Sequence, residues 1–138
     1  MSEISTNEKL MELIFKGVDH SIESIKDSKI PLIPFVMTQK DEKIEIKRFV
    51  AVKLEEAVEK ARGYIVDLTD IPDFAILAYE GNLVLNGNKY DAILIDAFDK
   101  SDSIAYCFAQ RFKPKKFLSK FKQIGNITLV DKFESPFY

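Results

Sequence analysis

The chain has 138 residues and a formal net charge of −2, with 46% hydrophobic and 30% charged residues. This balance predicts a single globular domain, residues 1–138, large enough to bury a core without a metal or a disulfide. Cys107 is the only cysteine, which excludes an intramolecular disulfide and a multi-cysteine zinc site. No run of about 18 apolar residues and no signal-peptide pattern is present, so we expect a cytoplasmic protein without a membrane partner. The near-neutral charge gives no reason to expect a nucleic-acid partner.

The N-terminal third predicts one helix followed by a β-hairpin. Apolar residues recur at helical spacing from Leu10 to Ile25, after capping residues at positions 5–7, so we expect a helix over about residues 6–27. Two β-rich stretches within residues 30–50 flank a polar turn. Pro31 and Pro34 cannot donate to a ladder, so the first strand should lie at an edge or begin late.

A second helix is expected from Leu54, because Leu54, Ala57, Val58 and Ala61 form one apolar stripe. Gly63 is the expected C-terminal residue of left-handed conformation, although the pattern leaves open a continuation as far as Pro72.

The remaining residues predict an antiparallel meander. Three turns are expected, at residues 80–82, 86–88 and 99–102, and Asn86-Gly87 is the strongest hairpin signal among them. Pro114 can open a short third helix over residues 114–123, closed by Gly125 and followed by a last strand at residues 126–130. The fold class is therefore α+β, in which the N-terminal hairpin and the C-terminal meander pack with two main helices and a short third helix.

The acidic stretch from Tyr90 to Phe112 raises the question of a metal site. If the turn at residues 99–102 closes so that opposed residue numbers sum to 201, Ile93, Ile95 and Ala97 lie on a bulky face. The four aspartates of this stretch then point to separate places, so no metal site is predicted. Asp96 alone falls on an apolar face of small residues, where a carboxylate needs a bonding partner. That face, a candidate interface or pocket, comprises Tyr90, Ala92, Leu94, Asp96, Ala105, Cys107 and Ala109, and should be covered by the first helix or by another subunit.

Other residue types that carry chemistry do not form a recognisable site. His20 is the only histidine, and no nucleophile motif accompanies it or Cys107, so we interpret His20 as a surface residue and Cys107 as a small buried one. No phosphate-binding glycine motif is present, and no cofactor is expected. Hydrolysis through two carboxylates would need Glu80 and Asp96 to meet, which no spacing argument supports.

A basic stretch near the C-terminus is a candidate site for an anion or an acidic partner. It contains no acid and comprises Arg111, Lys113, Lys115, Lys116, Lys120 and Lys122. The interleaved Phe117 and Phe121 share a helical stripe with Leu118, which favours core anchors over base-stacking platforms.

The runs YDAILIDAFDK and AYCFAQRFKPKKF, followed by IGN, resemble a segment of small bacterial proteins of unknown function. The resemblance covers residues 74–126 and implies no activity. The expected order of helix, hairpin, helix and meander is also similar to the profilin-like or roadblock arrangement, as an analogy of fold only.

Together these features favour a non-catalytic binding or self-association module, with a homodimer or a protein partner. One alternative is an immunity or antitoxin-type inhibitor that blocks a protein partner through a charged surface. A second alternative is a hydrolase using Asp96 or His20.

Overall fold

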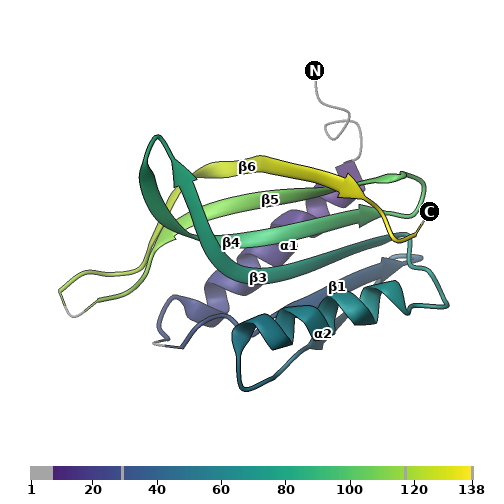
Figure 1. Ribbon diagram of the computed structural model, residues 1–138, viewed down its shortest axis with the longest axis horizontal. Helices are drawn as coiled ribbons and strands as arrows, with labels where there is room; N and C mark the ends of the chain where they lie inside the picture. The colour runs from purple at the N-terminus through teal and green to yellow at the C-terminus, as the bar shows by residue number, and fades with distance from the viewer. Residues whose placement is uncertain (1–7, 29, 117, 138) are drawn as a thin grey trace.

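The computed structural model describes residues 8–28, 30–116 and 118–137, which form two helices and six strands (Figure 1). In chain order these are α1 (Glu8–Ile25), β1 (Phe35–Lys40), β2 (Lys43–Arg48), α2 (Leu54–Val66), β3 (Phe74–Leu85), β4 (Asn88–Asp99), β5 (Ile104–Lys113) and β6 (Lys122–Glu134). The strands form one antiparallel sheet in the order β2-β1-β3-β4-β5-β6. The α+β class is therefore confirmed. Neither helix is long and apolar enough to cross a membrane.

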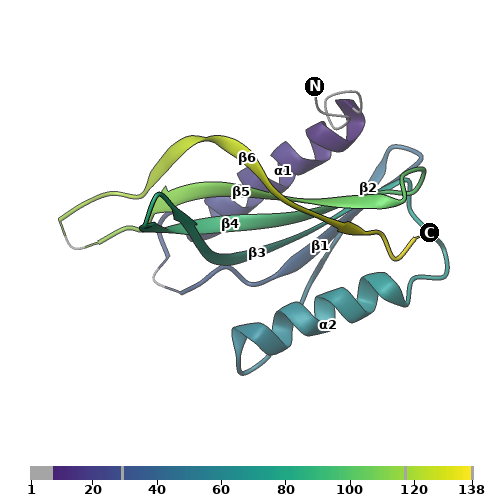
Figure 2. The same cartoon turned by 45° about the horizontal axis from the view of Figure 1, so that its top comes forward.

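The two helices lie on opposite faces of the sheet (Figure 2). α1 packs on β1, β3 and β4, whereas α2 packs on β1 and β3 on the other side. Two hydrophobic clusters result, one on each face. The sheet therefore has one face under α1 and a second face that α2 covers only over part of its width.

The N-terminal hairpin begins late, as the prolines predict. β1 starts at Phe35, immediately after Pro34, and lies between β2 and β3 rather than at an edge. Asp41 and Glu42 have positive φ angles of 49° and 70°, which matches the two-residue turn that joins tightly paired antiparallel strands. The residues before β1 run outside the sheet.

β3 and β4 form a longer hairpin than expected. Asn86 and Gly87 have φ angles of 52° and 78°, which confirms the turn predicted there. The turn predicted at residues 80–82 is wrong, because β3 continues through it to Leu85. Gly81 serves close packing instead: a Cβ atom at this position would lie 2.6 Å from Cδ1 of Leu94 on β4.

The β4–β5 hairpin has the expected sorting of faces but a different pairing. Ile95 opposes Phe108 and Asp96 opposes Cys107, so opposed residue numbers sum to 203 and the predicted register is wrong by two residues. A shift of two preserves the side to which each residue points. The bulky residues therefore still share one face, and the small residues with Asp96 share the other.

A buried glutamine accompanies the irregular pairing of β5 with β6. The register shifts at two points, after Cys107 and after Ala109. Gln110 is buried beside the second irregularity, and its Nε2 donates to the carbonyls of Ile124 and Gly125, each at 3.1 Å. These bonds satisfy backbone acceptors that an irregular ladder leaves without their usual donors.

The ends of the helices differ from the simplest expectation. Gly63 does not end α2; the continuation that the sequence left open is observed as far as Val66, and Asp67 caps the helix in a right-handed helical conformation. The short third helix is not observed in the described residues on either side of residue 117. Lys116 and Ser119 instead exchange backbone hydrogen bonds in a turn, and β6 begins at Lys122. Direct cross-strand pairing of residues 113 and 122 holds this segment as a hairpin.

α1 approaches the sheet closely at Gly17. A Cβ atom at this position would lie 2.1 Å from Cδ1 of Ile76, which is fully buried on β3. Ser21, one turn later, is also buried, and its hydroxyl donates to the Gly17 carbonyl at 2.7 Å. The glycine thus allows the helix axis to sit near the strands.

Gly17→Ala should lower the free energy of unfolding by about 1–3 kcal/mol, because the added methyl group overpacks a filled core. In an Ile76→Val background, which lacks Cδ1, the same change should stabilise the protein by up to about 1 kcal/mol through the helix propensity of alanine. Urea unfolding of the four proteins of this double-mutant cycle measures both effects. A similar loss in both backgrounds would contradict the close approach.

Candidate binding surfaces

Asp96 forms a polar cluster on the face opposite α1. Its exposed fraction is 4%, and it lies directly across from Cys107. Arg62 reaches over the sheet from α2, with its Nη2 atom 3.7 Å from Oδ2 of Asp96 and 3.2 Å from the hydroxyl of Tyr79. A helix therefore supplies the partner that the isolated carboxylate requires.

Burial dominates the ionisation of this cluster. It raises the pKa of Asp96, and the neighbouring Cys107, Arg62 and Tyr79 offset this only in part. Burial and the adjacent Asp96 carboxylate together raise the pKa of the Cys107 thiol to about 12. Burial also raises the pKa of Tyr79. The thiol is consequently protonated at neutral pH, so it has the character of a small buried side chain rather than of a nucleophile.

The small-residue face is not covered by α1, which lies on the bulky face, so the first of the two expected covers is wrong. Phe98 and Ala105 pack with Phe133 and Phe137 from the C-terminal part of the chain. Farther along the strands, Arg111 stacks over the ring of Tyr90, with its guanidinium carbon 4.8 Å from the ring centroid. The candidate interface residues Tyr90, Leu94, Asp96, Ala105 and Cys107 do share one face, and longer side chains cover much of it.

The aspartates of the Tyr90 to Phe112 stretch are dispersed. Asp91 lies on the face of β4 opposite to Asp96, and Asp99 and Asp102 belong to the β4–β5 turn. In that turn the carboxylates accept backbone N–H bonds from Ser101 and Ile104, each at 2.9 Å. Among the described residues no three metal-ligating side chains group together.

The predicted basic patch is divided by the loss of the expected helix. Arg111 lies on the sheet over Tyr90, whereas Lys115, Lys116 and Lys120 lie in the β5–β6 connection, which projects beyond the sheet at the left of Figures 1 and 2. Lys113 directly opposes Lys122 at the base of this projection. The patch is therefore a solvated basic hairpin rather than a helical face, and its rings Phe112 and Phe121 stack on each other 5.3 Å apart.

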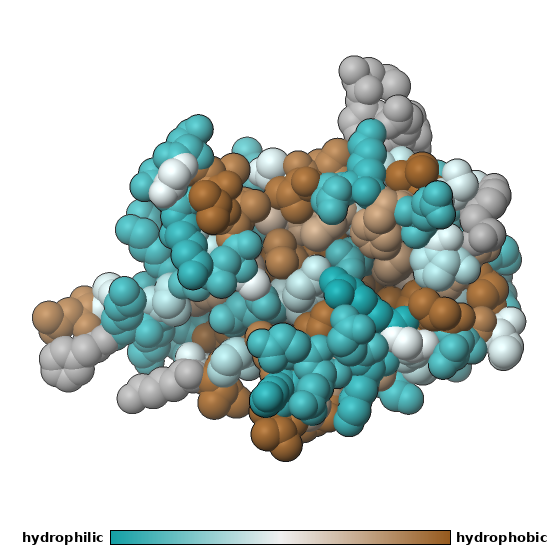
Figure 3. All heavy atoms as spheres, viewed as in Figure 1, coloured by the Kyte–Doolittle hydropathy of each residue, from teal (hydrophilic) through white to brown (hydrophobic). Residues whose placement is uncertain are grey.

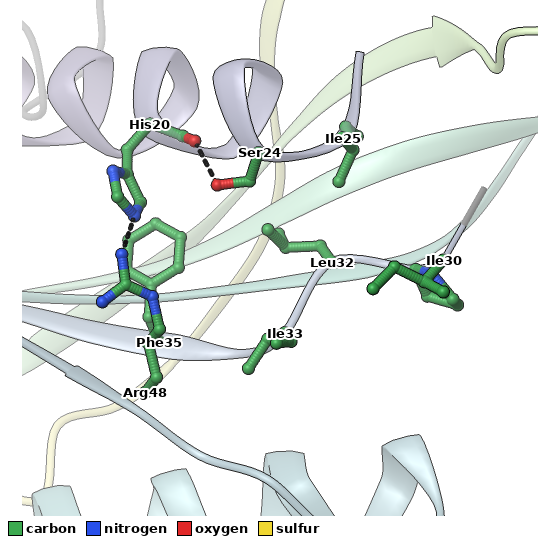
Figure 4. Close-up of a pocket in the computed structure, with 9 residues that line it drawn as sticks. His20, Ser24, Ile25, Ile30, Leu32, Ile33, Phe35 and Arg48 are labelled. Atoms are coloured by element: carbon green, nitrogen blue, oxygen red, sulfur yellow. Dashed lines mark hydrogen bonds between the residues drawn. The ribbon is translucent and has the colours of Figure 1, made fainter. Parts of the chain in front are cut away.

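His20 lines a small cavity between the end of α1 and the start of β1 (Figure 4). The cavity measures about 80 Å³, and its walls are mainly apolar, with Ile25, Leu32 and Phe35 among them. Arg48 of β2 donates to Nε2 of His20 at 3.1 Å, and the imidazole packs edge-on against the Phe35 ring. Burial, and secondarily the positive charge of Arg48, lowers the pKa of His20, so the imidazole is neutral at pH 7.

Arg48 has no carboxylate within 4.0 Å in the described part of the chain. Among the described residues, its side chain hydrogen-bonds to the neutral His20 ring alone. A guanidinium carries five N–H donors, so most of them remain available at the edge of the cavity.

An apolar surface adjoins this cavity, and sequence analysis did not identify it. The segment 30–33 lines both the cavity and a neighbouring groove of about 220 Å³, whose far wall is the segment 49–54. Five large aliphatic side chains are exposed along the groove: Ile30, Ile33, Val50, Val52 and Leu54. We call this set the aliphatic surface. Hydrophobic atoms reach the lower margin of Figure 3, where the chain enters α2 in Figure 1.

The position of the aliphatic surface follows from the prolines. Pro31 and Pro34 keep the segment before β1 out of the ladder, so Ile30 and Ile33 stay exposed, although Leu32 between them is buried in the core under α1. Glu80 accepts a hydrogen bond from the Leu32 backbone N–H at 3.2 Å and ties this segment to β3. An apolar run broken by two prolines was the available sequence signal, and we interpreted it as the start of a strand.

The candidate catalytic residues do not converge. His20 lies on α1, which covers one face of the sheet, and Asp96 points to the other face. The Ser24 hydroxyl, one turn from His20, donates to the His20 carbonyl rather than to its ring. Glu80 lies on the α1 side of β3, also away from Asp96, so it forms no carboxylate pair with Asp96.

Comparisons with known proteins add no assignment: no family model, no curated protein and no solved structure matches the chain.

Asp96→Asn should change how stability depends on pH. Because burial raises the native pKa of Asp96 above its value in the unfolded chain, the native state binds more protons in the pH range between the two values. The free energy of unfolding of the wild type, relative to Asp96→Asn, should therefore fall as pH rises through this range and level off above it. Each unit of pKa displacement contributes about 1.4 kcal/mol. Urea unfolding of both proteins between about pH 4 and pH 8 measures the difference, and a constant difference would contradict the burial of the charge.

Native Cys107 should react with a disulfide reagent at least about 100-fold more slowly than the urea-unfolded chain, because it is buried and protonated. Absorbance of the released thiolate follows both reactions. Equal rates would show that the Asp96 cluster is open to solvent.

Proposed function

We propose that the protein is a non-catalytic binding module that takes a protein partner on the aliphatic surface. The observation that carries the proposal is the exposure of several large aliphatic side chains at one place: Val52 is 97% exposed, Val50 71% and Ile30 64%. Grouped aliphatic exposure of this kind is typical of interaction sites, whereas single exposed residues are ordinary. The groove between segments 30–33 and 49–54 gives a partner side chain a place to insert.

A heterologous partner fits this surface better than a second copy. A two-fold dimer brings the same patch of both subunits together. The described residues that line the cavity and the groove include no Asp or Glu, so a second copy of this patch would offer Arg48 no carboxylate. The self-association predicted from the small-residue face receives less support, because the C-terminal residues and Arg62 already lie over part of that face.

The proposal can be tested by placing a photo-crosslinking amino acid at Val52 in the native cell. We expect one discrete product, which disappears when Ile33→Asp is added, because a charge in the groove excludes an apolar side chain. A crosslinker at Val84 provides the control, since Val84 is also an exposed valine and lines neither the cavity nor the groove.

The mass of the product and light scattering of the purified chain distinguish the occupants. A product at twice the mass of the chain, with a dimer in solution at micromolar concentration, would show that the surface binds a second copy instead of a heterologous partner. The same products at Val52 and Val84, or a product that survives Ile33→Asp, would contradict the docking surface. All these substitutions are at exposed or partly exposed positions and should change stability by less than about 0.5–1 kcal/mol.

A further inference from the structure

We infer that the cavity beside His20 and Arg48 recognises the free carboxyl terminus of the partner, whose last aliphatic side chains lie in the cavity and along the aliphatic surface. This inference rests on the proposed function and specifies the chemistry of the bound segment. It joins two features that are adjacent in the structure: a cation with no carboxylate near it in the described part of the chain, and a largely apolar cavity that shares the segment 30–33 with an apolar groove.

The charge of the site favours a carboxylate. Arg48 stands at the cavity without an acidic partner among the described residues, and His20 beside it is held neutral. Guanidinium and carboxylate groups form paired, charge-assisted hydrogen bonds, which are stronger than those between neutral groups. A bound anion would therefore complete the hydrogen bonding of Arg48 within the described site.

The shape of the cavity favours a chain terminus over an acidic side chain. The cavity of about 80 Å³ has room for a few non-hydrogen atoms and is lined by Ile25, Leu32 and Phe35. A C-terminal residue presents its carboxylate and its side chain from one Cα atom, so it can satisfy Arg48 and fill the cavity together (Figure 4). An Asp or Glu side chain brings a carboxylate on a short methylene stem, without a separate aliphatic side chain on the same Cα atom.

The neighbouring groove accounts for the residues that precede the terminus. The segment 30–33 forms a wall common to the cavity and the groove, so a chain that ends in the cavity can continue over Val50 and Val52. On the far side of the groove, Lys60 donates to the Val50 carbonyl at 3.5 Å, which holds this wall against α2. The aliphatic surface and Arg48 thus act on the same bound segment.

The test uses the full chain and a synthetic pentapeptide ending in Leu-Val, prepared with a free α-carboxylate and as the C-terminal amide. Isothermal titration calorimetry should show binding of the acid, and binding of the amide at least about tenfold weaker, because the amide loses the charge-assisted bonds. Arg48→Gln should bind the acid as weakly as the wild type binds the amide. Arg111→Gln, an arginine stacked on Tyr90 away from the cavity, is the matched control and should bind the acid as the wild type does.

Several outcomes would overturn the inference. Equal binding of the acid and the amide, or binding of neither peptide, would do so. So would a preference for the acid that survives Arg48→Gln. Displacement of the peptide by octanoate from the same residues would also overturn it. Far-ultraviolet circular dichroism of each variant verifies that it is folded.

The effect of Ile33→Asp separates this inference from the proposed function. If the acid and the amide bind equally and Ile33→Asp abolishes the binding of both, the docking surface is supported and recognition of the terminal carboxylate is wrong. If Ile33→Asp has no effect on any peptide that binds, the docking surface itself is wrong.

Discussion

The register of β4 between β3 and β5 is the constraint on which the rest of the structure depends. It sets Ile93, Ile95 and Ala97 under α1, where Gly17 lets the helix approach within contact of Ile76. Since side chains alternate along a strand, the same register must send Asp96 to the other face. A slip of one residue would bury Asp96 beneath α1 and turn Ile93 and Ile95 to the other face.

The carboxylate on the second face has its own structural consequence. A buried charge without a partner costs several kcal/mol, and Arg62 on α2 is placed to reduce that cost. The position of α2 over β1 and β3 and the polar cluster around Asp96 are thus linked, because one side chain spans both. Arg62 also forms an ion pair with Glu59, which lies three residues earlier on α2. This arginine therefore lies within a small network of charged and polar side chains.

Local sequence signals predicted those parts of the fold that local chemistry decides. The apolar stripe of α1, the delay of β1 behind Pro34, and the Asn86-Gly87 turn each depend on residues close in sequence. The errors occur where distant residues decide. Gly81 indicated a turn, but Leu94 packs over it within a continuous strand. Lysines and phenylalanines after Pro114 indicated a helix, but β6 pairs with β5 and draws the segment into a hairpin.

In the candidate sites, too, local sequence predicted some features, whereas distant residues decide the others. The grouping of Tyr90, Leu94, Asp96, Ala105 and Cys107 on one face was predictable from alternation alone. The covering of that face was not, because it comes from α2 and from the C-terminal residues. The cavity at Arg48 was also beyond sequence analysis, since it joins α1, β2 and the segment before β1.

The aliphatic surface depends on the same architecture. Segment 30–33 is tied to the sheet by the bond from Leu32 to Glu80, and β2 leads directly from Arg48 into segment 49–54. The two walls are therefore fixed to neighbouring strands, although neither wall belongs to a strand. If a partner docks there as we propose, a surface held in this way needs little rearrangement, which lowers the entropic cost of association.

Nuclear Overhauser contacts between backbone protons of β4 and β5 test the central claim most directly. The structure predicts contacts of Asp96 with Cys107 and of Ile95 with Phe108, its opposed residues. Contacts that instead oppose Asp96 to Ala105 would show the alternative register two residues away. Contacts from an odd shift would place Asp96 beneath α1 and contradict the arrangement of both faces.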